Sequence, residues 1–290
     1  MPILNWVSAR RRARPDSAGR VMYLEVRGEK TFAGTGGVPF DATRPALVFI
    51  HGSGLDHTFW ALHTRFFAYR GYGVLAPDLP GHSLSSGAPL DRIEAMADWL
   101  REFLDAVGVS KVALVGHSQG CLVALEFAAR HPDVLSCVCF VASGVATPVN
   151  PRLIDAAEHH PDQAVAMMTS WGFGPSGQFH LGPVPGNAML ANGQRVMRAN
   201  APEALSADLK ACDAYHNGPA AAASVRCPAH VIVGGMDRMA PRRATAALVA
   251  ELDNPTVTRV PESGHMVPVE APDRCRTALR DFIFEHYPAR

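Results

Sequence analysis

Short apolar runs recur along this chain, and most of them are separated by stretches with a longer hydrophobic period. Continuous apolar runs of strand length are typical of strands that are buried on both faces of a parallel sheet. The runs are Ala46–Ile50, Tyr72–Ala76, Val112–Val115, Val138–Ala142, Ala229–Val233 and Val257–Val260. Two earlier segments, Val21–Arg27 and Thr31–Ala33, flank a turn that begins at Gly28, and together they predict a hairpin.

The stretches between these runs predict helices. From Ile93 to Val107, apolar residues stand at 96, 97, 100, 103, 104 and 107, which follows the helical period of about 3.6 residues. Similar patterns cover Leu122–Arg130, Ala244–Leu252 and roughly Asp273–Glu285. Strands that alternate with helices indicate an α/β fold with a mostly parallel sheet and helices on both faces.

Residues 147–218 interrupt this alternation. They contain no clear strand, they are rich in Met, Ala, Gly and Pro, and they have helical patterns near Arg152–Trp171 and Gln194–Cys212. An irregular stretch from Gly172 to Gly186 separates the two, and a loop of that length in a compact domain is usually a lid or binding element. The sequence therefore predicts a helical cap at 147–218, inserted between core segments 21–146 and 219–290.

Composition and charge narrow the class of protein. The 290 residues are 48% hydrophobic and 19% charged, which excludes a disordered chain. Lys+Arg and Asp+Glu are both 27, so a globally basic nucleic-acid binder is disfavoured, and no apolar run approaches the roughly 20 residues of a membrane span. Residues 1–20 nevertheless carry five arginines and one aspartate; we interpret them as a disordered basic tail rather than an anchor for an anionic surface.

The cysteines and the absence of cofactor motifs indicate where the protein is located and whether it needs a cofactor. Six cysteines stand at 121, 137, 139, 212, 227 and 275, mostly in apolar runs, with no CxxC and no zinc-like spacing. Buried reduced thiols and the lack of an apolar segment after the basic N-terminus predict a cytoplasmic location. There is no GxGxxG after a strand, no GxxxxGK[ST] and no HExxH, so we expect neither a metal nor an organic cofactor.

The segment Gly116-His-Ser-Gln-Gly120 carries the most specific chemical signal. It directly follows the predicted strand Val112–Val115 and precedes a predicted helix, which is the context that gives a G-x-S-x-G pattern meaning. Such a turn strains its central residue and brings the flanking positions too close for a Cβ atom. Ser118 is therefore predicted to be a nucleophile at the N-terminus of the helix, where the helix dipole favours negative charge.

A serine nucleophile needs a base and an orienting acid. Among thirteen histidines, His265 alone lies on a loop between the last predicted strand and the final helix, and we predict it to be the general base. Asp237 follows the strand Ala229–Val233 and is predicted to orient His265; the alternative role is a helix N-cap before Pro241. The chain order Ser, Asp, His is the one expected for this type of turn.

A glycine-rich loop follows the strand that ends at Ile50. In His51-Gly-Ser-Gly54, a backbone N–H could point at the oxygen of the reacting carbonyl, with the Gln119 N–H as second donor. The sequence leaves open whether Ser53 or Gly54 supplies the first donor, and Ser53 is favoured. We interpret His51 as a structural residue of this loop.

Taken together, these motifs resemble the α/β-hydrolase-fold superfamily, in the serine-esterase branch with a helical cap. The likeness runs from Tyr23 to Tyr287 and includes the stretches Asp78-Leu-Pro-Gly-His-Ser83 and Gly264-His-Met-Val-Pro-Val-Glu-Ala-Pro272. It implies an eight-stranded type of sheet, and hydrolysis by water without a cofactor. Haloalkane dehalogenases and epoxide hydrolases of the same fold use Asp as nucleophile, so Ser118 at that position disfavours those activities.

The resemblance leads to a ranked set of functions. The first is a carboxylesterase acting on a small to medium, apolar ester; a C–C bond hydrolase, thioesterase, acyltransferase or amidase with the same triad is the alternative. A third class, a ligand-binding receptor that keeps the hydrolase fold, also remains open, because a fold does not fix a function. Met and aromatic residues of the cap, Trp171 and Phe173 above all, are the candidates for contact with substrate.

Overall fold

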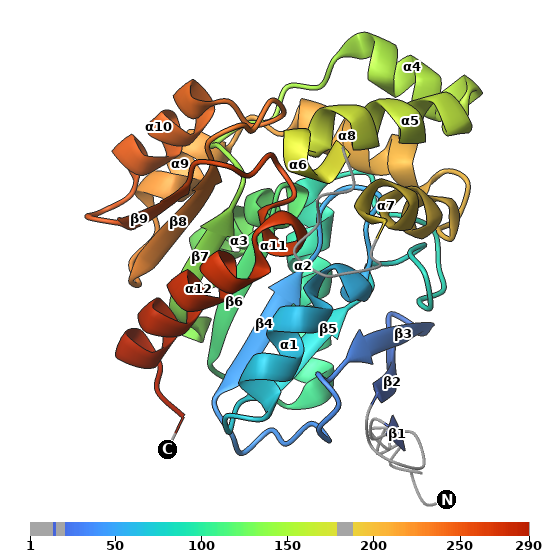
Figure 1. Cartoon of the computed structure of the whole chain (residues 1–290). Coiled ribbons are helices and arrows are strands. Elements are labelled where there is room, and N and C mark those ends of the chain that lie inside the picture. Colours follow the sequence, from blue (N-terminus) through green and yellow to red (C-terminus); the bar gives the residue numbers. More distant parts are fainter. Residues whose placement is uncertain (1–13, 16–20, 179–187, 290) are drawn as a thin grey trace, which may run out of the picture.

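The computed structural model describes residues 14–15, 21–178 and 188–289. Its centre is a nine-stranded sheet with the order β1-β2-β3-β5-β4-β6-β7-β8-β9 (Figure 1). The strands are β1 Arg14–Pro15, β2 Val21–Val26, β3 Glu29–Gly34, β4 Ala46–Ile50, β5 Gly73–Pro77, β6 Val112–His117, β7 Leu135–Val141, β8 Ala229–Gly234 and β9 Thr256–Val260. The strands β4 to β9 pair in parallel, whereas β2 and β3 form the predicted antiparallel hairpin. The predicted α/β fold with a mostly parallel sheet is confirmed.

Helices cover both faces of the sheet. They are α1 Ala61–Ala68, α2 Ile93–Val107, α3 Gln119–Arg130, α9 Gly218–Ala223, α10 Arg242–Glu251, the short α11 Val267–Glu270 and α12 Pro272–His286. α2, α3, α9 and α10 pack on one face, and α1 and α12 on the other (Figure 1). Of these, α1, α9 and α11 lie in stretches for which the hydrophobic pattern predicts no element.

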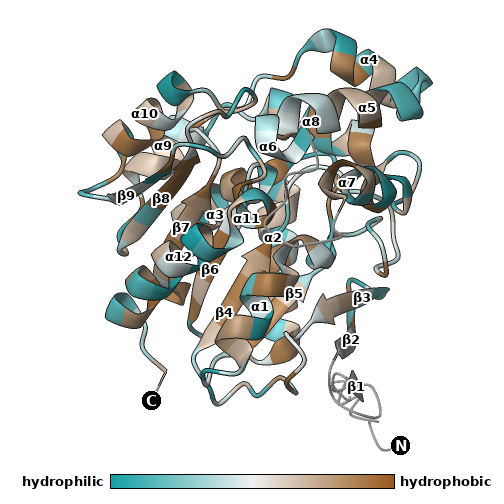
Figure 2. Cartoon of the chain, in the orientation of Figure 1, coloured by the Kyte–Doolittle hydropathy of each residue, from teal (hydrophilic) through white to brown (hydrophobic). Residues whose placement is uncertain are grey.

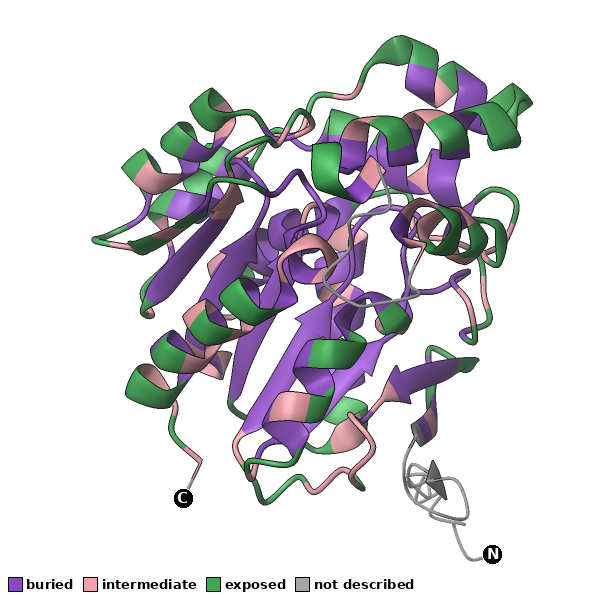
Figure 3. Ribbon diagram, viewed as in Figure 1, coloured by how far each residue is buried: buried purple, intermediate pink, exposed green. Residues whose placement is uncertain are grey.

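The central strands are apolar on both sides, as the continuous runs predict. In β4, Leu47 and Phe49 join the core under α1 and α12, whereas Val48 and Ile50 join the core under α2 and α3. Figure 2 shows these strands as a brown hydrophobic centre, and Figure 3 shows that they are buried. Successive side chains of a strand point to opposite faces, so a strand with a helix layer on each side must be apolar throughout.

The chain between β7 and β8 forms helices over the carboxyl ends of the central strands (Figure 1). They are α4 Pro151–His159, α5 Pro161–Gly172, α6 Pro175–Gln178, α7 Met189–Arg198 and α8 Ala204–Ala214. The single helical pattern near Arg152–Trp171 is two helices, because the chain leaves helical geometry at His160 and Pro161 begins the next helix. We call residues 147–218 the cap.

Several predictions fall partly outside the described residues. In the irregular stretch Gly172–Gly186, residues 175–178 form α6, and residues 179–187 are not described. Of the basic segment 1–20, only Arg14–Pro15 is described, and it pairs with β2 in antiparallel fashion. Within the described ranges, no helix is long and apolar enough to cross a bilayer.

Candidate active site

The turn between β6 and α3 has the strained geometry that the motif predicts. Ser118 has φ 52° and ψ −115°, and its backbone N–H donates to the Val141 carbonyl at 3.0 Å. A Cβ atom added to Gly116 would lie 2.4 Å from the Gly120 carbonyl oxygen, and one added to Gly120 would lie 2.5 Å from the Ile50 carbonyl oxygen. Both positions therefore require glycine, and a conformation such as that of Ser118 costs about 1–3 kcal/mol.

His265 and Asp237 lie side by side on the loops after β9 and β8. The His265 Nδ1 and Asp237 Oδ2 atoms are 2.9 Å apart, and both side chains are almost fully buried. The other oxygen of Asp237 accepts the backbone N–H groups of Met239 and Ala240, each at 2.8 Å. Burial alone would raise the pKa of Asp237, but the charge and hydrogen bonds of these partners lower it. An ionised Asp237 holds the proton of His265 on Nδ1 and leaves Nε2 free to accept one.

The loop that carries His265 is held by Glu270. Its Oε2 accepts the backbone N–H groups of Gly264 at 3.1 Å and of Gly174 at 2.9 Å, and its Oε1 accepts that of Met266 at 3.1 Å. Burial raises the pKa of Glu270. Since Gly174 belongs to the cap, one carboxylate joins the His265 loop to the cap.

His117, inside the turn, also contacts the loop that carries His265. Its Nε2 donates to the backbone carbonyl of His265 at 3.1 Å, and its ring packs on Phe59 with centroids 4.4 Å apart. Burial and the nearby His265 lower the pKa of His117 to about 3, so the ring is neutral. The sequence motif gives His117 no role of its own, and only the structure shows this contact. From the cap side, the Gly172 carbonyl accepts the His265 N–H at 2.8 Å.

The glycine-rich loop after β4 lies directly against the turn. A Cβ atom added to Gly52 would be 2.7 Å from His117 Nδ1 and 3.1 Å from Ser118 Cβ. The Gly54 N–H donates to Asp208 Oδ2 at 2.7 Å. Among the described residues, no backbone carbonyl accepts the N–H of Ser53, whereas the N–H of Gly54 is already engaged.

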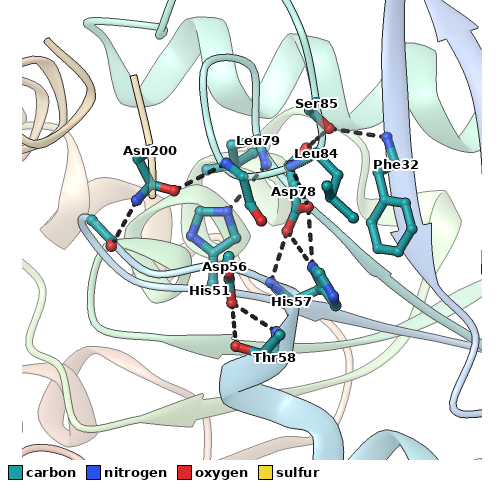
Figure 4. Close-up of polar contacts among 12 residues, drawn as sticks. Phe32, His51, Asp56, His57, Thr58, Asp78, Leu79, Leu84, Ser85 and Asn200 are labelled. Carbon is teal, nitrogen blue, oxygen red and sulfur yellow. Dashed lines mark hydrogen bonds and ion pairs between the residues drawn. The ribbon is translucent and has the colours of Figure 1, made fainter. Parts of the chain in front are cut away.

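Behind this loop, a polar network joins the ends of β4 and β5 (Figure 4). Fully buried Asp78 accepts the His57 backbone N–H and the His57 Nδ1–H, both at 2.8 Å. His51 Nε2 accepts the Leu79 N–H at 3.1 Å, which places the proton of the ring on Nδ1. These contacts give His51 the structural role that the sequence predicts.

One cavity joins the predicted groups. It has a volume of about 320 Å³, within the range of small-ligand sites, and both Ser118 and His265 line it. Its walls also include Ser53, Thr147, Pro148, Val149, Asn150, Leu153, Met168, Trp171, Leu209, Cys212, Arg238 and Met239. Ser118 Oγ and His265 Nε2 share this cavity without a hydrogen bond between them in the described contacts; such bonds are often loose before a ligand binds.

The two aromatic residues that the sequence favours for substrate contact are separated. Trp171 lines the cavity beside Ser118, whereas Phe173 is 4% exposed and lines a second cavity of about 240 Å³ with Phe59, Met189 and Met197. Trp171 lies at the end of α5 and Phe173 just past it, and residues two positions apart do not share a helix face.

The sequence motifs assign no role to three charged residues at or near the site. Glu270 and Asp208 hold its loops, and Arg238 lines the cavity with no ion-pair partner in the part of the chain that the structure describes. The signal for Asp208 was available: it lies between Leu205 and Leu209 on the apolar face of a helix, where a carboxylate needs a partner.

The fold is that of the α/β-hydrolase class. A family model described as the alpha/beta hydrolase family matches residues 47–278, and the chain belongs to that family.

The chain is also similar to proteins with quite different names. It is 25% identical to "Protein ABHD8" of Mus musculus over 289 residues, covering 94% of this chain but only 62% of that protein. It is 28% identical to the "Magnesium-chelatase 30 kDa subunit" of Rhodobacter capsulatus, over 83% of this chain and 88% of that one. An enol-lactonase from Burkholderia xenovorans has a similar fold, with a TM-score of 0.80 at 20% identity over 90% of this chain and 99% of that one.

Proposed function

We propose that this protein is a serine hydrolase that cleaves a carboxylic ester of a small to medium, apolar substrate through an acyl-enzyme. The observation that carries the proposal is the cavity that strained Ser118 and His265 both line, with Asp237 hydrogen-bonded to His265. The reaction that we propose needs neither a metal nor an organic cofactor.

In this proposal, His265 Nε2 takes the proton of Ser118 Oγ as that oxygen attacks the ester carbonyl carbon. The backbone N–H groups of Ser53 and Gln119 stabilise the oxyanion, and each such donor is typically worth about 2.7–4 kcal/mol. The protonated His265 then gives its proton to the leaving alcohol. Water, deprotonated by the same histidine, releases the acid and restores Ser118.

The walls of the cavity support an apolar substrate. Leu153, Met168, Trp171 and Leu209 bound it, and long, unbranched Met side chains adapt to different shapes. A lactone is a cyclic ester, so the similarity to an enol-lactonase supports the same chemistry. We keep Trp171 as the residue that contacts substrate; Phe173 could reach only a substrate that extends into the second cavity.

A ligand-binding or regulatory role is the second candidate. It is favoured by one observation: a relative that aligns over most of both chains is named as a subunit of a chelatase. A thioesterase, C–C bond hydrolase, acyltransferase or amidase would use the same residues. We also propose a cytoplasmic location, on the basis of six unpaired cysteines, five of them buried.

The test is a chain-length series of p-nitrophenyl esters, with acyl-thioesters and vinylogous diketones beside it, on the wild type and Ser118→Ala. We expect ester turnover that falls by about 10⁵-fold or more in Ser118→Ala, because the nucleophile is lost. A fluorophosphonate should label the wild type and Ser170→Ala, a control serine exposed on α5, but not Ser118→Ala. Labelling of Ser118→Ala would refute the nucleophile, and negligible turnover together with ligand-induced thermal stabilisation would favour the receptor.

A further inference from the structure

Helix α8 of the cap places a buried carboxylate against the loop that carries Ser53. Asp208 is 0% exposed, and Leu205 and Leu209 on the same helix face are buried beside it. A buried charge is costly unless it is paired and hydrogen-bonded. The partners of Asp208 are therefore informative about its role.

Asp208 contacts both backbone segments that supply the proposed oxyanion donors. Its Oδ2 accepts the Gly54 N–H at 2.7 Å, and Gly54 directly follows Ser53. Its backbone carbonyl accepts Gln119 Nε2 at 3.3 Å. Asp208 is thus hydrogen-bonded to Gly54, which follows the proposed donor Ser53, and to Gln119, which carries the second proposed donor.

A charged histidine fixes the orientation of this carboxylate. His82 Nε2 lies 3.0 Å from Asp208 Oδ2, and His82 Nδ1 lies 3.0 Å from the Pro80 carbonyl oxygen. Both partners are acceptors, so both ring nitrogens donate and the ring is an imidazolium. Burial alone would lower the pKa of His82, but the charge and hydrogen bond of Asp208 raise it; the same pair lowers the pKa of Asp208 against the effect of burial.

A second cap side chain holds the other side of the same glycine. Asn200 Nδ2 donates to the Gly54 carbonyl at 2.8 Å, and its Oδ1 accepts the Ser83 N–H at 2.9 Å (Figure 4). Gly54 has φ +67°, a region that side chains rarely adopt. Its N–H and its carbonyl are therefore both fixed by residues that lie about 150 positions further along the chain.

Stability alone does not explain the ion pair between Asp208 and His82. Asp208 Oδ1 is buried and has no hydrogen-bond partner among the described residues. Buried ion pairs are often no more stabilising than apolar replacements, and an unpaired oxygen adds a further cost. What the pair supplies is a defined position for the Gly54 N–H.

We propose that Asp208 is a positioning residue: through Gly54, its carboxylate holds the Ser53 N–H at the distance from the Gln119 N–H that the transition state requires. The proposal rests on the function proposed above. It makes the cap part of the catalytic geometry as well as a cover for the substrate.

The test compares Asp208→Ala, Asp208→Asn and a control on the same helix, Lys210→Met, which breaks the exposed pair with Glu158. Rates are expressed per serine that a fluorophosphonate titrates, so that a misfolded fraction does not count. Asp208→Ala should lower kcat about 10- to 100-fold, with KM within about threefold of the wild type, because misplaced donors affect the transition state more than the ground state. Asp208→Asn should lose less, since its amide oxygen still accepts the Gly54 N–H, and Lys210→Met should match the wild type.

A trifluoromethyl ketone, which mimics the tetrahedral intermediate, gives a readout that a merely structural role would not move. Its affinity should fall in parallel with kcat across the Asp208 variants. Unchanged kcat per titrated serine, or a rise in KM alone, would overturn the proposal. If Asp208→Ala does not fold, Asp208→Asn and Asn200→Ala carry the same test. An inactive wild type would contradict the proposed function instead, whereas an active wild type with unaffected Asp208 variants contradicts this inference alone.

Discussion

The turn at Ser118 and the loop at Ser53 face the same cavity, but they are held in different ways. The turn is held by backbone packing inside the core, where Gly116 and Gly120 allow chain segments to approach to distances that exclude a Cβ atom. The loop is held by side chains from the cap, through the contacts of Asp208 and Asn200 with Gly54. The proposed nucleophile therefore depends on a contiguous motif, and the proposed oxyanion loop depends on a distant helix.

The difference shows where the cap can influence chemistry. A change in the cap leaves the backbone contacts of Ser118 intact, but it reaches Ser53 through the hydrogen bonds of Asp208 and Asn200 to the next residue. The cap also contacts Ser53 directly, because Cys212 Sγ lies 3.6 Å from Ser53 Oγ. The base is intermediate: His117 and Asp237 hold it from the core, while Glu270 and the Gly172 carbonyl link its loop to the cap.

Among the predicted changes in kcat and stability that compare core with cap, substitutions of the proposed base and its acid should have the largest effect. His265→Ala should lower kcat nearly as much as Ser118→Ala, because it removes the group that is proposed to take the serine proton. Asp237→Asn should be milder, at about 10⁴-fold, since the ring remains but its tautomer is no longer fixed. Steady-state rates on a p-nitrophenyl ester measure both, and an Asp237→Asn enzyme with wild-type kcat would contradict the role of Asp237.

Two glycine substitutions test the comparison directly. In Gly120→Ala, the new Cβ meets the backbone carbonyl of Ile50 at 2.5 Å; in Gly54→Ala, it meets the end of the Leu205 side chain at 3.0 Å. Gly120→Ala should thus lower the free energy of unfolding by several kcal/mol, whereas Gly54→Ala should cost only about 1–2 kcal/mol for its positive φ and still lower kcat.

Urea denaturation gives the two free energies, and the ester assay gives the activity of the folded fraction. Equal destabilisation by both alanines would mean that the loop is as firmly held as the turn. A Gly54→Ala protein with unchanged kcat would show that the loop geometry does not matter to the reaction.

The smallest predicted effect is the contribution of the His82–Asp208 pair to the pH dependence of stability. The raised pKa of His82 gives stability that is complete below its unfolded value of about 6.5 and is lost as pH rises through the folded value. The lowered pKa of Asp208 gives stability that is present above about 3.8 and is lost as pH falls through the folded value. Neighbouring His51 is neutral, because burial lowers its pKa.

The difference in Tm between wild type and Asp208→Asn should therefore be greatest between about pH 4 and 6.5, and it should shrink on both sides of that window. Thermal unfolding across pH 3–9 for the two proteins checks this. A difference that does not change with pH would mean that the two groups are not an ion pair.

The sequence by itself determined the sheet, most of the helices and the strained turn at Ser118, the proposed nucleophile. Apolar runs and helical periods are local patterns, and the Ser118 turn needs only its own glycines and flanking elements, so each could be recognised within a short segment. The partnership of Asp237 and His265 was also predictable, because loops at the carboxyl ends of parallel strands meet at one edge of the sheet.

Only the tertiary structure decided how the cap meets that edge. It placed Trp171 in the cavity and Phe173 outside it, and it brought Asp208 to Gly54 across 154 positions of sequence. Hydrophobic patterning shows that a helix has a buried face, but it does not show which segment lies opposite that face. Contacts between distant side chains arise when the whole core packs, and no local pattern in the chain encodes them.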